Sequence, residues 1–121
     1  MIKFRIKKQN ILKLFNDAIK SGGLTVGKSG KIAEFDRGYQ VSKKDCFIIN
    51  IDKKNECLKA IKNVLDKIKS DEFCGLWVDG GKLYADISIN ILDRSKAIKM
   101  GKKLNQFSIF DWSNKICINL K

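Results

Sequence analysis

The sequence predicts a single α+β domain spanning residues 1–121, with a mostly antiparallel sheet and about three helices packed on one face. Short stretches of alternating apolar and polar residues are typical of half-buried strands, and three longer stretches place apolar residues at helical spacing. A Gly-Gly pair at 80–81, between two alternating stretches, indicates a tight β-hairpin. The expected order of elements is β-α-β-β-β-α-β-β-α-β-β.

The chain begins with a predicted strand and a predicted helix. Residues 2–8 alternate between apolar and basic side chains, which indicates a strand with a basic outer face. Asn10 is a favourable N-cap residue, so a helix is expected after it, with apolar positions from Ile11 to Ile19. The Ser-Gly-Gly sequence at 21–23 then ends this helix, because glycine accepts the left-handed conformation at a helix C-terminus.

Residues 24–51 are expected to form strands and turns. A turn is predicted at 27–30, because glycines bound this segment. Asp52 is then expected to cap a second helix over roughly residues 53–69. The strands predicted in this part of the chain are 24–26, 32–35, 39–41 and 46–49.

The hairpin predicted over 74–88 has a defined register, because its two-residue turn requires positive φ angles. This register pairs Val78 with Leu83 on the core face and Trp77 with Tyr84 on the opposite face. Two interpretations of the aromatic pair stay open. Trp77 and Tyr84 either form an exposed docking pair or are covered by the loop at 36–46.

The C-terminal part of the chain predicts a third helix and a second hairpin. Asp93 is expected to cap the helix, which spans about residues 93–105. Five of its polar positions are basic, and apart from this cap none is acidic. The hairpin is predicted over 107–110 and 116–120.

The chain is strongly basic. It carries 25 Lys+Arg against 13 Asp+Glu, a formal net charge of +12 at pH 7, which favours an acidic partner. Lysine supplies 22 of the 25 basic residues, and the codon bias of an A/T-rich genome would raise the lysine content without any partner. Two interpretations therefore stay open: a functional basic surface, or codon bias combined with solubility.

Three groups of basic residues are candidates for binding an acidic partner. The third helix and the outer face of the first strand are the first two groups. The remaining group places a tyrosine among cations, as in sites for single-stranded nucleic acid. The candidate residues are Lys3, Arg5 and Lys7 in the first strand; Arg37, Tyr39, Lys43 and Lys44 in the middle of the chain; and Arg94, Lys96, Lys99, Lys102 and Lys103 in the third helix.

Several kinds of chemistry are excluded or disfavoured. The chain has no histidine, so Ser-His and Cys-His nucleophile pairs are excluded. Its four cysteines show no C-x-x-C spacing, so no zinc site is expected and the thiols are predicted to be reduced and mostly buried. No catalytic residue, metal or cofactor is therefore predicted. Without an apolar run of membrane-spanning length or a signal-peptide core, a cytoplasmic location in a host cell is expected.

Two features of the sequence are compatible with an enzyme. Residues 22–29 match the P-loop pattern G-x-x-x-x-G-K-[ST], which must follow a buried strand and open a helix because the helix amides hold the phosphates. Here a helix is expected before the motif and a strand after it, so the match is interpreted as a helix end and a hairpin turn.

The other enzymatic alternative is a small metal-dependent nuclease that holds its metal through Asp79, Asp86 and Asp111.

Four segments resemble a family of small, uncharacterised proteins of phages and mobile elements. They are GGLTV at 22–26, GYQVS at 38–42, GLWVD leading to YADIS between 75 and 88, and NQFSIFD at 105–111. The resemblance covers most of residues 11–120. It implies a small accessory protein of the sort aimed at host defence, and it implies no catalytic residue.

The predicted function is therefore non-enzymatic. The chain is expected to bind and inhibit a host defence nucleoprotein, in the manner of anti-CRISPR or anti-restriction proteins, through its basic surfaces. Two alternatives stay open: a direct DNA- or RNA-binding accessory protein, and the metal-dependent nuclease.

Overall fold

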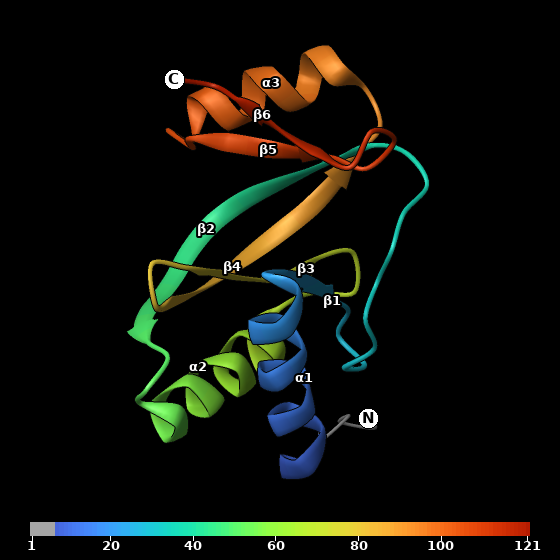
Figure 1. Ribbon diagram of the computed structural model, residues 1–121. Helices are drawn as coiled ribbons and strands as arrows, with labels where there is room; N and C mark the ends of the chain where they lie inside the picture. Colours follow the sequence, from blue (N-terminus) through green and yellow to red (C-terminus); the bar gives the residue numbers. More distant parts are fainter. Residues whose placement is uncertain (1–6) are drawn as a thin grey trace.

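The computed structural model describes residues 7–121 and confirms the α+β class. Within this range three helices and six strands form, and Figure 1 shows α1 and α2 at one end of the molecule and α3 at the other. The elements are α1 (Lys8–Ser21), β1 (Gly23–Val26), β2 (Tyr39–Asn50), α2 (Lys54–Lys67), β3 (Phe73–Asp79), β4 (Lys82–Ile91), α3 (Arg94–Lys103), β5 (Ser108–Asp111) and β6 (Ile116–Asn119).

All six strands pair antiparallel in one curled sheet, in the order β1-β3-β4-β2-β5-β6. The β3–β4 hairpin has the predicted register, with Val78 opposite Leu83 and Trp77 opposite Tyr84. The long strands β2 and β4 cross the molecule diagonally and connect its two ends (Figure 1). They therefore set the position of α3 relative to the other two helices.

The three helices pack against one face of the sheet, as predicted. In β4, Leu83 and Ala85 lie in the core cluster that α1 and α2 cover, whereas Ile89 and Ile91 pack against a second cluster that contains Ala97 of α3. These four β4 positions share one side of the strand, because side chains alternate between the two faces of a sheet. Two apolar clusters thus lie side by side on a single face.

The opposite face carries a buried polar and aromatic group. Gln40 donates from its Nε2 to Ser88 Oγ at 2.9 Å, and its Oε1 accepts from Trp112 Nε1 at 3.0 Å. Phe35, in the irregular segment before β2, packs edge-on against Phe73 and Trp112, with ring centroids 5.2 Å and 5.4 Å apart. The segment before β2 therefore covers part of the face that the helices leave open.

Two predicted helix starts are wrong. α1 begins at Lys8, so Asn10 lies in its first turn, where its backbone N–H donates to the Lys7 carbonyl at 2.9 Å. Lys8 is therefore helical rather than part of the strand predicted over 2–8, and residues 2–6 of that prediction lie outside the described residues. Asp52 does not cap α2, which starts at Lys54 with no side-chain cap. In both cases burial of the apolar stripe, rather than capping, holds the helix.

The strands before α2 also differ from the prediction. The predicted strands 39–41 and 46–49 are one strand, β2, interrupted by bulges between Ser42 and Lys44 and between Asp45 and Phe47. Each bulge inserts an extra residue, so the alternation breaks although pairing continues. The strand predicted over 32–35 is reduced to a single bridge between Ile32 and Val26.

Candidate functional site

The third helix places its basic residues as the sequence predicted. Asp93 caps it by accepting the Lys96 backbone N–H at 3.0 Å. Ala97 and Gly101 are buried against the sheet, and a Cβ on Gly101 would overlap Leu120 Cδ1. This close packing fixes the rotation of the helix, so its cations face solvent. We define the α3 surface as the five exposed residues Arg94, Lys96, Lys99, Lys102 and Lys103.

Among residues 7–121, no acidic side chain forms an ion pair with the α3 surface. Residues 7–121 contain two ion pairs, Lys43–Glu72 and Lys62–Asp66, and neither involves α3. Arg94 is the α3 cation whose charge acts on Asp111, and the pKa of Asp111 is lowered mainly by the hydrogen bond from the Asn114 side chain. The other four cations therefore form an unpaired basic row on the outside of the helix.

An exposed aromatic side chain lies just beyond α3. Phe107 precedes β5 and is 76% exposed, and Lys121 Nζ lies 4.4 Å from its ring centroid. Lys121 and Lys115 are also exposed, so cations continue onto the C-terminal hairpin. The sequence did not identify Phe107 as a candidate. The alternation of apolar and polar residues near a strand does not reveal which side chains stay exposed to solvent.

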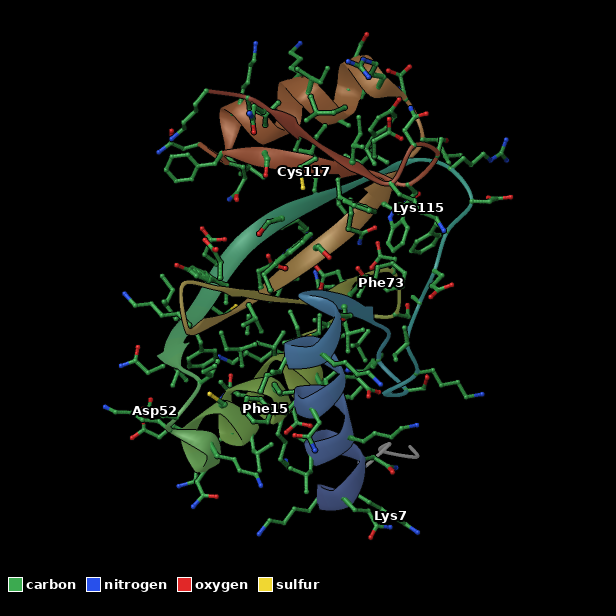
Figure 2. The ribbon with its side chains drawn as sticks, in the orientation of Figure 1. Lys7, Phe15, Asp52, Phe73, Lys115 and Cys117 are labelled. Atoms are coloured by element: carbon green, nitrogen blue, oxygen red, sulfur yellow. The ribbon has the colours of Figure 1, made fainter. Side chains whose placement is uncertain are left out.

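The other predicted basic residues do not join the α3 surface into one stripe. Lys3 and Arg5 lie outside the described residues, and Figure 2 shows Lys7 at the end of α1 farthest from α3. Tyr39 is partly buried and packs against the cluster beneath α3. Arg37 and Lys44 are exposed. The basic residues are thus spread over separate surfaces.

Lys43 belongs to a local ion pair. Its Nζ donates to Glu72 Oε2 at 2.6 Å, and Glu72 Oε1 accepts the Lys69 backbone N–H at 2.8 Å. The contact raises the pKa of Lys43 and lowers the pKa of Glu72, chiefly through the side-chain hydrogen bond that they share. Lys43 therefore ties β2 to the loop before β3 and is a poor candidate for a phosphate contact.

Trp77 and Tyr84 lie on the face opposite the helices, beside Ile48 of β2. Tyr84 is directly opposite both Trp77 and Ile48, which makes a row of three side chains across β3, β4 and β2. Trp77 is 42% exposed and Ile48 is 64% exposed. The Trp77 ring lies over Gly23 and 6.2 Å from the Phe110 ring.

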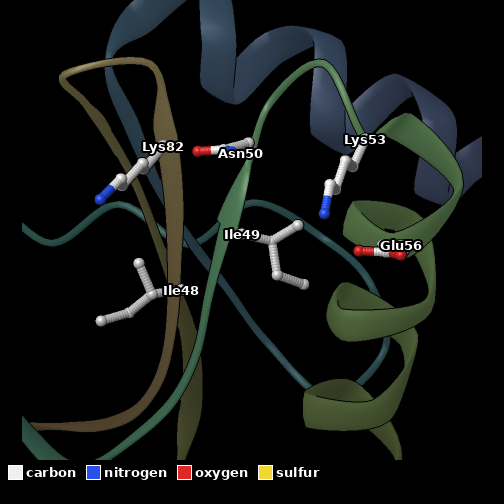
Figure 3. A pocket seen from close by; sticks show the side chains of 6 residues that line it. All are labelled: Ile48, Ile49, Asn50, Lys53, Glu56 and Lys82. Carbon is white, nitrogen blue, oxygen red and sulfur yellow. The ribbon is translucent and has the colours of Figure 1, made fainter.

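A shallow hollow of about 310 Å³ lies at the end of β2. Figure 3 shows Ile49 pointing toward α2 and Ile48 pointing to the other side of the strand. Lys53 and Glu56 line the helix side of the hollow, and Lys82 lines the sheet side. The charged residues that line this hollow are therefore two lysines and one glutamate.

The three aspartates considered for a metal site are separated. Asp79 is exposed at the end of β3, and Asp111 accepts hydrogen bonds from Asn114 and from the Ser113 backbone. Asp86 follows the core residue Ala85 in β4, so it lies on the face opposite the helices, whereas Asp111 is opposite Tyr39, which packs beneath α3. Within residues 7–121 no group of three or more acidic or cysteine side chains gathers closely enough to hold a metal ion.

Asp86 is nevertheless unusual. Its carboxyl is buried, and its Oδ1 has no hydrogen-bond partner. Burial, with a smaller contribution from the charge of Asp45 across the strand, raises the pKa of Asp86 to about 7. Sequence reasoning named this residue for the wrong reason, since its position suits a buried proton better than a metal.

The P-loop-like segment forms a helix end followed by a turn, as predicted. Gly22 ends α1 in the left-handed conformation, with φ of 88°. The turn is closed by hydrogen bonds from Gly27 N to Lys31 O at 2.9 Å and from Ala33 N to Thr25 O at 2.7 Å, and no helix follows. Lys28 Nζ donates to the Ile68 carbonyl at 2.6 Å. The lysine of the motif therefore anchors the turn to the end of α2.

Comparisons with protein-family models, with curated proteins and with solved structures find no match for this chain. The resemblance to phage and mobile-element proteins accordingly stays a prediction. Among the helices that the structure describes, none has the length and apolar character needed to cross a membrane.

Proposed function

We propose that this chain is a non-enzymatic binding protein that inhibits a host defence nucleoprotein, anti-CRISPR-like or anti-restriction in kind, by docking its α3 surface on the nucleic acid of that complex. The observation that carries the proposal is the unpaired row of cations on one ten-residue helix. Like charges three or four residues apart on a helix oppose each other by roughly 0.2–0.5 kcal/mol per pair. A polyanion relieves this repulsion when it binds.

The arrangement within α3 favours a phosphate backbone. Lys96, Lys99 and Lys103 follow one another at spacings of three and four residues, so they share one side and span about 10 Å. Lys102 and Lys103 in the last turn also complement the helix dipole, but Lys96 and Lys99 gain nothing from it. Lysine contacts phosphate as a point charge and does not read base edges, so we expect binding without sequence preference.

Phe107 favours single-stranded over duplex nucleic acid. An exposed ring beside cations lets a base stack while the phosphates pair, and such stacking is tolerant of sequence. A base splayed from a single strand reaches this ring, whereas a base within a duplex is already stacked. Displaced strands and guide RNAs in defence complexes supply such a ligand.

The test compares two variants with the same loss of charge. The α3 variant replaces Lys96, Lys99, Lys102 and Lys103 with glutamine. The α2 control variant does the same at four exposed positions, Lys53 just before α2 and Lys54, Lys59 and Lys67 within it. Fluorescence anisotropy with a labelled single-stranded oligonucleotide should show affinity at least about 100-fold weaker for the α3 variant, since each charge-assisted hydrogen bond is worth roughly 1.5–3 kcal/mol. Equal weakening in both variants would refute the assignment to α3.

A second arm separates the inhibitor from a direct DNA- or RNA-binding accessory protein. The chain is added to a purified, guide-loaded or DNA-loaded defence nuclease, and cleavage and co-elution are measured. An inhibitor co-elutes with the complex and blocks cleavage, and the α3 variant does neither. Oligonucleotide binding without co-elution or inhibition would favour the accessory protein.

A further inference from the structure

A cleft of about 580 Å³ lies between α1 and the turn that follows β1. This volume falls within the range of roughly 300–1,000 Å³ typical of sites for small ligands. Residues of α1 and its start, between positions 7 and 17, form one wall, and residues 29–32 form the other. Figure 1 shows this end of α1 and the α3 helix at opposite ends of the molecule, so the cleft is separate from the α3 surface.

Both walls are fixed without a ligand. Ile11, Leu14 and Phe15 anchor α1 in the main core. The opposite wall is a closed turn, and the hydrogen bond from Lys28 to the Ile68 carbonyl fastens it to the end of α2. A cleft between two anchored walls loses little conformational freedom when a ligand enters.

The charges in the cleft are unevenly distributed. Lys7, Lys13 and Lys31 line it together with a single carboxylate, Asp17. Lys13 and Asp17 are four residues apart on α1, yet neither takes part in the two ion pairs of residues 7–121. Asp17 lies one helical turn beyond Lys13 and farther still from Lys7. Along α1 the lining therefore runs from Lys7 through Lys13 to Asp17, and none of these side chains forms an ion pair within residues 7–121.

We infer that this cleft binds a nucleotide through its phosphate group. The ammonium groups of Lys7, Lys13 and Lys31 surround the phosphate, which carries between one and two negative charges near pH 7. The Asp17 carboxylate accepts a hydrogen bond from a sugar hydroxyl or from an amino or imino group of the base. Leu14 and the exposed Ile32 provide apolar contact beside these charged groups.

The test is a titration of the ¹⁵N-labelled full chain with uridine 5′-monophosphate, with uridine and with inorganic phosphate, followed by amide chemical shifts. The nucleotide should give saturable shifts at residues 9–17 and 28–32, phosphate should bind more weakly at the same place, and uridine should not bind. The Lys13→Gln/Lys31→Gln variant should raise the Kd for the nucleotide at least about tenfold, because it removes two charge-assisted contacts. The Asp17→Asn variant should reduce the preference for nucleotide over phosphate.

The control variant Lys20→Gln/Lys59→Gln removes the same charge from exposed positions outside the cleft and should leave the Kd unchanged. Nucleotide shifts confined to other elements, or equal effects of the two double variants, would overturn the inference. The phosphate can also belong to a nucleic-acid end, in which case a 5′-phosphorylated oligonucleotide binds more tightly than its 5′-hydroxyl form and Lys13→Gln/Lys31→Gln abolishes the difference. The α3 variant should keep its affinity for the nucleotide, so failure here is distinguishable from failure of the proposed function.

Discussion

Replacing Asp86 with asparagine should remove a pH dependence from the stability of the fold. The carboxyl is buried opposite Asp45, and its pKa is raised from 3.8 to about 7. Between these two values the folded chain keeps a proton that the unfolded chain has lost. Stability from this group is therefore fully present below about pH 4 and is lost as the pH rises to about 7. Three pH units at about 1.4 kcal/mol each give an upper bound of about 4 kcal/mol.

The assay is urea unfolding followed by circular dichroism at several pH values between about 4.5 and 7.5. The quantity compared is the difference in the free energy of unfolding between Asp86→Asn and the wild type. Glu72 and Asp111 are present in both chains, and their lowered pKa values reduce stability only as the pH falls, so their effect cancels in this difference. The variant should gain relative to the wild type as the pH rises. Asp79→Asn, an exposed change on the same hairpin, should run parallel to the wild type. A constant difference between Asp86→Asn and the wild type would refute the reasoning.

Two further predictions concern packing and thiol chemistry. Gly75→Ala should lower the free energy of unfolding by about 2 kcal/mol or more, because its Cβ would overlap Asp86 Oδ1, whereas Gly27→Ala, with its nearest neighbour at 3.7 Å, should change little in thermal melts. In a thiol-labelling time course, exposed Cys117 should react first, and buried Cys74, whose pKa is strongly raised by burial, should react only on unfolding. A fast phase that survives Cys117→Ser would contradict the second expectation.

Local patterns predicted those parts of the fold that depend on neighbouring residues. The Gly-Gly turn determined the β3–β4 register, and Asp93 marked the start of α3, because a two-residue turn and an N-cap are both set within a few residues. The continuous β2 was missed because its bulges break the alternation while the long partner β4 keeps the strand paired. The contact of Trp112 with Gln40 joins residues 72 positions apart, so no local pattern reveals it.

The two candidate sites also differ in whether a local sequence pattern could predict them. The α3 surface was predictable from the sequence, since every charged residue after the acidic cap of this helix is basic. The cleft was not predictable, because Lys13 and Lys31 line it together only when the turn after β1 folds back on α1. The Gly-Lys-Ser sequence at 27–29 did point to this part of the chain, although it forms a turn beside the cleft rather than a P-loop.

The salt dependence of oligonucleotide binding tests the central claim most directly. Each phosphate contact contributes about 0.7 to the slope of log K against log salt for a single strand. The α3 variant should therefore have a slope shallower than that of the wild type by about 2–3, while the α2 control variant keeps the wild-type slope. Identical slopes for the wild type and the α3 variant would contradict the assignment of nucleic-acid binding to α3.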